Sequence, residues 1–339
     1  MLSQSFCVLC KEDFIPVCEP CLNGNEFSYV KDCMDTGWIS SSGKYVSAFE
    51  QKFSAYCDCR YGVAVCNGTV ALHLALTSLG IGKGDEVILP SFTMAASAFA
   101  VLYTGAVPVL VDADPDTFNI DVRRLESVIT PKTKAIMPVH IFGNPCSMDT
   151  IRQTARNYDL FVVEDAAEAH GALYKGSKVG SLSDVAAFSF FANKNITTGE
   201  GGMVVTNNKD LYDKARYYKN MCFPLEGPRN YEHNDLGFNY RMSNLHAAIG
   251  LAQVEKADEY RAMRIKNHSL YKEYLKDLPG ISFQSDEPEA LNVAWMNTVV
   301  IAPDDYGHSR DELIGHLREH GIDTRLLFTG MQIGRASCR

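Results

Sequence analysis

The sequence predicts an α/β fold in which a mainly parallel sheet carries helices on both faces. Short apolar runs typical of buried strands alternate along the chain with longer stretches whose apolar residues recur at helical spacing. The run at residues 161–163 is followed directly by Glu164 and Asp165, and the run at 185–191 is followed three residues later by Lys194. Open α/β sheets gather ligand groups at the carboxyl ends of their strands, so this sheet edge is the predicted site.

Length and composition narrow the class of protein. A chain of 339 residues can bury a large core, as one large domain or as one domain with a smaller lobe. The net charge of −9 gives no support for nucleic-acid binding, so local amides and cations must hold any anionic substrate. No apolar run approaches the roughly 18 residues of a membrane span, and the first residues do not resemble a signal peptide. We therefore expect a cytoplasmic protein with no nucleic-acid or membrane partner.

The eleven cysteines need a separate interpretation. Without a secretory signal they indicate free thiols in a reducing cytoplasm. Cys7, Cys10, Cys18 and Cys21 form two CxxC pairs separated by seven residues. Zinc ribbons usually separate such pairs by more than ten residues, so incidental thiols are favoured over a structural zinc site, and no metal is predicted. Metal analysis of the purified protein distinguishes the two.

The expected elements follow from these patterns in chain order. Apolar runs between turn residues predict strands at 61–65, 87–90, 107–111, 135–140, 161–163, 185–191, 203–206 and 293–301. Helical periodicity predicts helices at 25–36, 68–79, 122–129, 148–158, 210–220, 243–278 and 310–320. The stretch at 243–278 is expected to lead into a smaller lobe.

The helix expected after residue 67 offers an anion site. Its first turn, at Gly68 and Thr69, presents free backbone N–H groups and the positive end of the helix dipole. An ordinary capped helix is the alternative, and this turn alone does not exclude it. The chain has neither a GxGxxG segment after an early strand nor a GxxxxGK[ST] segment, so nicotinamide and P-loop functions lack their phosphate loops.

A carboxylate and a lysine at one sheet edge suit pyridoxal phosphate. The lysine can bind the cofactor covalently, and the carboxylate can keep the pyridine nitrogen protonated so that the ring accepts electrons. Taken singly, Asp165 after a strand is more often a helix cap, and Lys194 is more often a solvated surface charge. The surrounding motifs decide between these interpretations.

Several segments resemble signatures of the DegT/DnrJ/EryC1/StrS family of sugar-nucleotide aminotransferases, over residues 15–328. They are NGTVALHLAL, GDEVILPSFT, EDAAEAHGA, SFFANKNITTGEGGM and GFNYRMSNLHAAIGLAQVE. The segment ITTGEGG is most similar to the GDP-perosamine synthase branch of the family. The resemblance implies a type I PLP-dependent transferase fold, like that of aspartate aminotransferase. This fold has a mainly parallel seven-stranded sheet and a smaller C-terminal α+β lobe.

The resemblance also implies a division of the chain. It assigns residues 15–240 to a large PLP-binding domain and residues 241–332 to an incomplete small domain. Residues 1–14 are expected to be a loosely held N-terminal extension. After residue 328 the resemblance stops, and residues 333–339 read like a translated sequencing adapter. We therefore expect a truncated gene with a foreign tail.

Carried over residue by residue, the resemblance assigns the catalytic and ring-binding roles. Lys194 is the lysine that binds the cofactor covalently, and Asp165 pairs with the pyridinium nitrogen. Glu168 contacts the ring oxygen, and its protonation state stays open because two carboxylates near a phenolate repel. His170 could be a second acid–base group, but a structural role is favoured.

The same comparison assigns the phosphate and stacking contacts. Gly68, Thr69 and Ser189 contact the phosphate, and Asn239 reaches the phosphate of a neighbouring subunit, which implies a homodimer with shared active sites. Met94 stands where the family usually has an aromatic residue stacked on the pyridine ring. Its thioether can replace that residue, or Phe92 can do so from a shifted loop.

These assignments imply a PLP-dependent aminotransferase of deoxyamino-sugar and polysaccharide biosynthesis. The expected substrate is a nucleotide-linked 4-keto-6-deoxy sugar, with GDP-4-keto-6-deoxymannose preferred, and the amine donor is L-glutamate. Related dehydratases replace the lysine with histidine, so Lys194 favours transamination. The alternatives are transamination of another keto sugar or an aminocyclitol, or a catalytically silent PLP-binding partner subunit.

Overall fold

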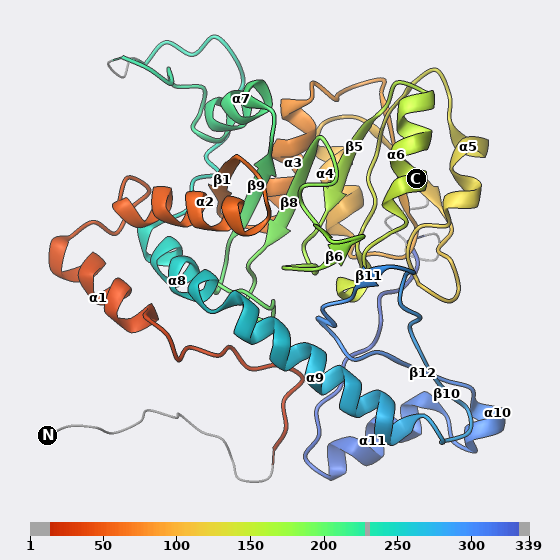
Figure 1. Ribbon diagram of the computed structural model, residues 1–339. Helices are drawn as coiled ribbons and strands as arrows, with labels where there is room; N and C mark the ends of the chain where they lie inside the picture. Colours follow the sequence, from red (N-terminus) through yellow and green to blue (C-terminus); the bar gives the residue numbers. More distant parts are fainter. Residues whose placement is uncertain (1–13, 228–230, 332–339) are drawn as a thin grey trace, which may run out of the picture.

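The computed structural model describes residues 14–227 and 231–331. The predicted α/β class is confirmed, because a seven-stranded, mainly parallel sheet runs through the centre of the molecule (Figure 1). Its spatial order is β1-β9-β8-β5-β4-β2-β3, and β9 is antiparallel to both of its neighbours. The seven strands are β1 (Tyr61–Val65), β2 (Glu86–Pro90), β3 (Val107–Val111), β4 (Thr133–Ile136), β5 (Phe161–Asp165), β8 (Val185–Ser189) and β9 (Gly202–Thr206).

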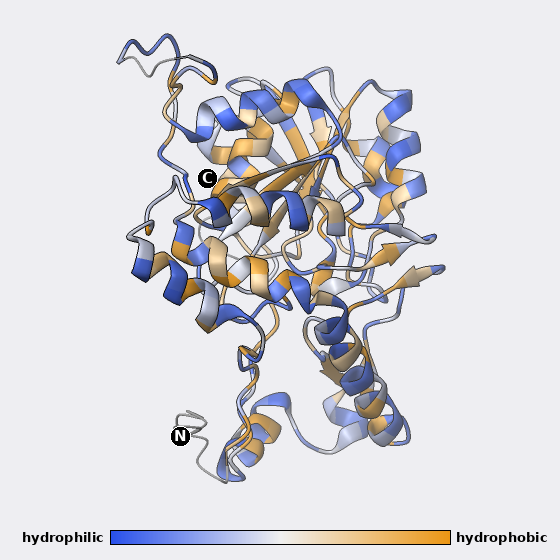
Figure 2. Ribbon diagram, turned by 60° about the vertical axis from the view of Figure 1, so that its left-hand side comes forward, coloured by the Kyte–Doolittle hydropathy of each residue, from blue (hydrophilic) through white to orange (hydrophobic). Residues whose placement is uncertain are grey.

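Helices cover both faces of this sheet because its strands are apolar on both sides. Alternate residues of β8 point to opposite faces: Phe188 joins the core under α1, α2, α5, α6 and α8, and Ala187 joins the core under α3, α4 and α7. Figure 2 shows the apolar strands inside and hydrophilic colour on the outer helices. These helices are α1 (Glu26–Thr36), α2 (Lys44–Tyr56), α3 (Gly68–Ser78), α4 (Ala96–Tyr103), α5 (Leu125–Val128), α6 (Met148–Asn157), α7 (Lys209–Lys219) and α8 (Asn244–Glu255).

The C-terminal part begins with a long helix that leads away from the sheet. α9 (Ala257–Leu275) ends beside the pair β10 (Ile281–Phe283) and β12 (Val299–Ile301) and the helices α10 (Pro303–Tyr306) and α11 (Arg310–Glu319) (Figure 1). β11 (Ala290–Leu291) instead pairs with β6 (Leu173–Tyr174), which pairs with β7 (Ser177–Lys178). The division at residue 240 stays a prediction.

Three sequence-predicted elements are corrected by the structure. The strand expected at 135–140 ends at Ile136, and Pro138, which has no N–H to donate, follows within two residues. Of the strand expected at 293–301 only the last three residues pair in β12, because Ala294 adopts a left-handed φ of 45°. The helix expected at 243–278 is two helices that meet at Lys256.

Two short 3-10 helices connect the elements near the site. They are η1 (Val122–Arg124) and η2 (Ile141–Gly143). No helix within the described ranges is long and apolar enough to cross a membrane. Cys7, Cys10 and the tail at 333–339 lie outside the described residues, as does the N-terminal extension except for Phe14.

Asn244 ties three segments of the large core together, which generates a prediction on stability. Its buried amide accepts a hydrogen bond from the Tyr45 N–H (2.9 Å) and donates one to the Trp38 carbonyl (2.6 Å). Asn244→Ala leaves both groups without this partner, so urea denaturation should give a free energy of unfolding lower by about 2–4 kcal/mol.

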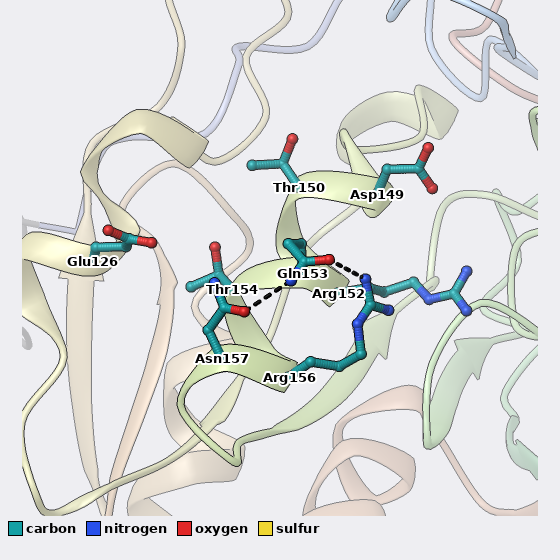
Figure 3. Close-up of a pocket in the computed structure, with 8 residues that line it drawn as sticks. All are labelled: Glu126, Asp149, Thr150, Arg152, Gln153, Thr154, Arg156 and Asn157. Atoms are coloured by element: carbon teal, nitrogen blue, oxygen red, sulfur yellow. Dashed lines mark hydrogen bonds between the residues drawn. The ribbon is translucent and has the colours of Figure 1, made fainter.

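The matched control for this variant is Asn157→Ala. The Asn157 side chain lies exposed at the end of α6 and bonds only its own helix, to Gln153 (Figure 3). Its loss should change the unfolding free energy by less than about 0.5 kcal/mol. Equal effects of the two variants would contradict the bracing role of Asn244.

Candidate active site

Asp165 ends β5 at the carboxyl edge of the sheet, as the sequence predicts. Its side chain is buried, and Oδ2 accepts a hydrogen bond from Ser97 Oγ at 2.7 Å. Oδ1 accepts a longer bond from the Ala167 N–H at 3.2 Å. Burial raises the pKa of Asp165, while the bond from Ser97 opposes that rise. Each oxygen keeps a lone pair with which to accept a further proton donor.

Lys194 lies in the turn that follows β8 and points at a second buried carboxyl. Its side chain is only 9% exposed, and Nζ lies 3.7 Å from Glu168 Oε1. Burial lowers the pKa of Lys194, and the charges of Glu168 and Asp165 oppose that shift. The structure thus places Lys194 beside Glu168, and the charge of Asp165 also acts on this lysine.

Glu168 is held from its other side by the backbone. Its Oε2 accepts a hydrogen bond from the Phe142 N–H at 2.7 Å. Burial raises the pKa of Glu168, and the nearby Lys194 charge lowers it. Burial thus outweighs the Lys194 charge, so this carboxyl takes up a proton more readily than an exposed glutamate does.

The predicted phosphate turn forms at the start of α3. Gly68 is its first residue, and the Asn67 side chain accepts the Val70 N–H at 3.0 Å. A Cβ added to Gly68 would lie 2.6 Å from Ser189 Cβ, so the turn reaches β8 only with glycine there. Gly68, Thr69 and Ser189 therefore meet as expected, with the first N–H groups of a helix beside a hydroxyl.

Met94 and Asn239 lie outside this buried group. Met94, just before α4, is 56% exposed. Asn239 is also exposed, in a segment whose neighbour Phe238 bonds back to α7 through the Tyr218 carbonyl (2.7 Å). Their predicted contacts with a cofactor ring and with a neighbouring subunit's phosphate stay predictions, as does the alternative role of Phe92.

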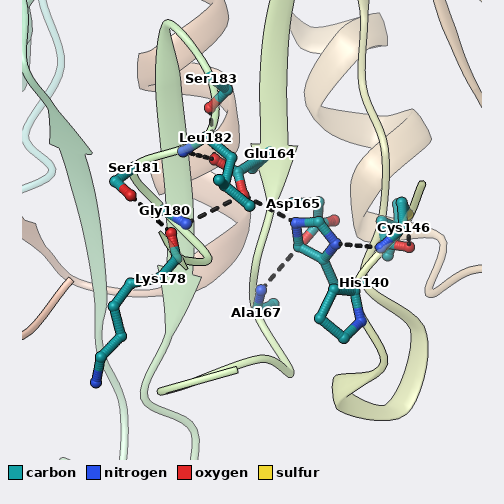
Figure 4. A network of polar contacts seen from close by, with 12 residues as sticks. His140, Cys146, Glu164, Asp165, Ala167, Lys178, Gly180, Ser181, Leu182 and Ser183 are labelled. Atoms are coloured by element: carbon teal, nitrogen blue, oxygen red, sulfur yellow. Dashed lines mark hydrogen bonds and ion pairs between the residues drawn. The ribbon is translucent and has the colours of Figure 1, made fainter. Parts of the chain in front are cut away.

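A buried network behind the sheet edge fixes the end of β5 (Figure 4). His140 Nδ1 accepts the Cys146 N–H at 3.0 Å, so Nε2 carries the proton and donates to Glu164 at 3.0 Å. Glu164 also accepts bonds from the Gly180 N–H and the Ser183 hydroxyl. Because the backbone N–H of His140 bonds the carbonyl of Asp165, this network holds the backbone of Asp165 in place.

His170 packs among aromatic rings beside the site. Its imidazole lies 5.4 Å from the rings of Phe188 and Phe190 and 6.0 Å from that of Phe53. Burial lowers the pKa of His170 to about 3, and the neighbouring Lys194 charge adds to this shift. A histidine that stays neutral at ordinary pH supports the structural interpretation over an acid–base role.

Sequence reasoning missed three residues that contact the predicted group. Ser97 lies in the loop-to-helix segment after β2, and Phe142 lies in η2 with a left-handed φ of 57°. The indole ring of Trp295 lies 3.4 Å from Lys194 Nζ. Of the three residues, only Ser97 had a signal in the sequence, namely its place in the segment PSFTMAAS. Phe142 and Trp295 make contacts between distant segments, and no periodic pattern indicates them.

Other hollows and thiols lie apart from this group. A surface hollow of about 700 Å³ lies over α6, lined by residues such as Asp149 and Arg156 (Figure 3). Within the described ranges, no group of three or more His, Cys, Asp or Glu residues could hold a metal ion. Of the four cysteines considered for zinc, Cys18 and Cys21 are described, and both are free thiols.

Comparison with known proteins agrees with this geometry. A sequence model of the DegT/DnrJ/EryC1/StrS aminotransferase family matches residues 20–335. The chain belongs to this family. It is 50% identical to the GDP-perosamine synthase of Caulobacter vibrioides, over 94% of this chain and 85% of the relative. It is 46% identical to that of Escherichia coli O157:H7, over 93% and 85%.

Solved structures of family members share the fold. DesV of S. venezuelae superposes with a TM-score of 0.86 at 37% identity, over 92% of this chain and 82% of DesV. DesI, solved in the presence of its TDP-sugar product, gives a TM-score of 0.88 at 32% identity, over 97% and 83%. The predicted type I aminotransferase fold is thereby confirmed, and the chain is a PLP-dependent aminotransferase.

The described residues fit pyridoxal phosphate by the chemistry of their donor groups. A buried lysine whose pKa is lowered can supply the amine that binds the aldehyde, and Asp165 keeps a free lone pair for a pyridinium N–H. The start of α3 and the Ser189 hydroxyl offer donors to a phosphate dianion, and Gly68 leaves room for them.

Burial of Asp165 generates a prediction on pH and stability. Its raised pKa means that the folded protein binds the proton more tightly than the unfolded chain. The stability that this group supplies is present below pH 4 and is lost as the pH rises through the folded pKa. In the cofactor-free protein, Asp165→Asn should therefore raise Tm at pH 8 by about 1–3 °C.

This gain should shrink as the pH approaches 4, which thermal unfolding at several pH values measures. Asp149→Asn, which changes an exposed carboxylate paired with Lys175, is the matched control and should leave Tm within about 1 °C. A Tm lower than wild type for Asp165→Asn at pH 8 would refute the claim that burial dominates.

Proposed function

We propose that this enzyme transfers the amino group of L-glutamate to a nucleotide-linked 4-keto-6-deoxy sugar, with GDP-4-keto-6-deoxymannose as the preferred acceptor. The observation that carries the transfer chemistry is the buried group of Lys194, Glu168 and Asp165 at the sheet edge. A lysine with a lowered pKa beside two carboxyls suits proton transfer near neutral pH.

In this proposal the cofactor supplies an electron sink that carries the amino group between the two substrates. Asp165 would hold the ring nitrogen and stabilise its proton, and Ser97 keeps that carboxylate oriented. Lys194, once free, would carry the proton that moves during the transfer, and burial shifts its amine toward the neutral form. The first turn of α3 and Ser189 bind the phosphate.

The choice of sugar rests on the relatives rather than on the geometry. Two proteins named GDP-perosamine synthase are 50% and 46% identical to this chain, which favours a GDP-linked acceptor. DesI was solved with a TDP-sugar product, which keeps other nucleotides within the family's range. We place the exposed Asn239 at the phosphate of a neighbouring subunit, which makes the active enzyme a homodimer, and Met94 at the cofactor ring.

A catalytically silent PLP-binding partner is the second candidate. It is disfavoured because Lys194 and Asp165 belong to one buried group of ionisable side chains. A protein that only binds the cofactor does not need a lysine with a lowered pKa. Transamination of another keto sugar or an aminocyclitol uses the same residues. Only substrate analysis separates it from the preferred reaction.

Lys194 generates the first functional prediction. Borohydride treatment of the holoenzyme should attach the cofactor to the peptide containing Lys194, as peptide mass analysis measures. Lys194→Ala should reduce kcat by at least about 10³-fold, since it removes both the attachment point and the proton carrier. Lys209→Ala, which removes an exposed lysine bonded to Asp213, is the matched control and should keep wild-type turnover. Cofactor attached at another lysine would contradict the assignment of Lys194 as the residue that binds it.

The substrate generates a separate prediction. Incubation with glutamate and a panel of GDP-, dTDP- and UDP-linked keto sugars should give an amino sugar fastest with the GDP-linked 4-keto-6-deoxy sugar. Double-reciprocal plots should be parallel, because glutamate leaves as 2-oxoglutarate before the sugar reacts. Intersecting lines would contradict the two-stage transfer. A cofactor-loaded protein that releases no 2-oxoglutarate from glutamate would favour the silent partner.

A further inference from the structure

Three segments far apart in the sequence gather around the backbone just before Lys194. The carbonyl of Asn193 accepts a hydrogen bond from the indole Nε1 of Trp295 at 2.8 Å. The Cys18 thiol donates to the same carbonyl at 3.4 Å. From α9, Arg264 bonds the Cys18 sulfur at 2.9 Å and the Trp295 carbonyl at 3.3 Å. Since Asn193 directly precedes Lys194, its carbonyl sets the direction from which the lysine side chain leaves.

The face of the same indole meets the amino group of Lys194. Nζ lies 3.4 Å from the centroid of the Trp295 ring, within the range at which a cation is attracted to an aromatic face. Trp295 is only 5% exposed, so water screens this contact weakly. The indole N–H of Trp295 thus fixes the backbone before Lys194, and the face of the same ring contacts the amino group of the lysine.

The backbone of Trp295 closes a ring of contacts around the lysine. Its N–H bonds the Phe142 carbonyl at 2.8 Å, and the Phe142 N–H in turn bonds Glu168. Glu168 faces Lys194 from the other side, at 3.7 Å. The ring closes only because Phe142 and Ala294 adopt left-handed backbone conformations, with φ of 57° and 45°. Strained backbone of this kind is held by the surrounding contacts and is concentrated at functional sites.

We infer that Trp295 is a positioning residue for Lys194: its ring face holds the free amino group between covalent states, and its indole N–H, with Arg264 and Cys18, fixes the Asn193 carbonyl. This inference rests on the proposed role of Lys194. It assigns a function in the transfer reaction to a residue outside the family motifs that the sequence displays. The charged and titratable groups that face the lysine are Asp165, Glu168 and His170, with Arg264 behind the indole.

Two substitutions of Trp295 separate its two contacts. Trp295→Phe keeps an aromatic face and loses the N–H, whereas Trp295→Leu loses both. An aromatic face stabilises the ammonium form, so its loss lowers the pKa of the freed lysine. For Trp295→Leu, the acid limb of the kcat profile should therefore move down by about half to one pH unit, with kcat reduced about tenfold or more. For Trp295→Phe the limb should stay in place while kcat falls less.

In both variants the KM for glutamate should stay within about threefold of wild type, since the indole holds the lysine and not the substrate. A Trp295→Leu enzyme with wild-type kcat and pH profile would overturn the inference. A change confined to KM would overturn it as well, because it would make Trp295 a substrate contact. Circular dichroism and Tm confirm that each variant folds, and Trp295→Phe serves as the variant that preserves packing.

A second measurement does not depend on activity. The chain has two tryptophans, so Trp38→Phe leaves Trp295 as the only tryptophan, which can be excited selectively over the tyrosines. In the cofactor-free protein, the emission of Trp295 should change in one pH-dependent step as the neighbouring amine gains its proton. Lys194→Met should abolish this step. Emission that is indifferent to Lys194 would show that the contact does not form and would overturn the inference.

Arg264 and His268 provide a matched pair of variants on one face of α9. Arg264→Ala removes the bonds to Trp295 and Cys18 and should shift the emission of Trp295 and reduce kcat. His268→Ala, one turn further along, breaks a comparable bond to Asn297 (2.9 Å) without touching the lysine segment and should do neither. Equal effects of the two variants would overturn the bracing role of Arg264.

The failure of this inference can be distinguished from the failure of the proposed function. If Lys194→Ala kept full turnover, the proposed function would be wrong, and the inferred role of Trp295 in the reaction would fall with it, whatever the emission showed. If Lys194→Ala abolished turnover while the Trp295 variants behaved as wild type, only the present inference would be wrong.

Discussion

The site depends on the burial of three ionisable side chains at one edge of the sheet. Asp165, Glu168 and Lys194 lie so close together that each changes the pKa of another, and all three are withdrawn from water. Burial of a lone charge is strongly unfavourable, whereas one cation between two carboxyls offsets part of that cost. The residues form a unit, because a change of charge on one member alters the cost of burying the others. Such a group persists only if the surrounding fold is rigid.

The parallel sheet supplies that rigidity. β5 and β8 are neighbours in register, with Asp165 opposite Ala187, so the segments that follow them begin side by side. Glu164 of β5 forms a fully buried pair with His140, and both side chains are hydrogen-bonded. A polar network with every member bonded holds one geometry, whereas a partly bonded one would allow several. The buried pair of His140 and Glu164 thus fixes the backbone that carries the carboxylate of Asp165.

The division between what the sequence could predict and what it could not has a physical basis. Strand periodicity and strand ends are local properties, so Asp165 and Lys194 could be placed at one sheet edge from the alternation of elements alone. Trp295 reaches Lys194, and Phe142 reaches Glu168, next to left-handed backbone conformations at Ala294 and Phe142, which no apolar pattern indicates. The same conformation explains why residues 293–301 were wrongly predicted as one strand. Asn239 could be assigned only by resemblance, because the role proposed for it involves a second subunit.

Trp295 makes the chemistry dependent on the C-terminal part of the chain. Its indole lies on the lysine, and its backbone carbonyl is bonded to Arg264 on α9, the helix that leads away from the large core. A movement of α9 would therefore change the surroundings of Lys194 directly, with no change in β5 or β8. Since an ammonium is attracted to an aromatic face and a neutral amine much less so, the contact is strongest when the lysine is free and protonated. The C-terminal part then stabilises the stage at which Lys194 is free and protonated more than the other stages. A change in how this part packs on the sheet would therefore affect the reaction.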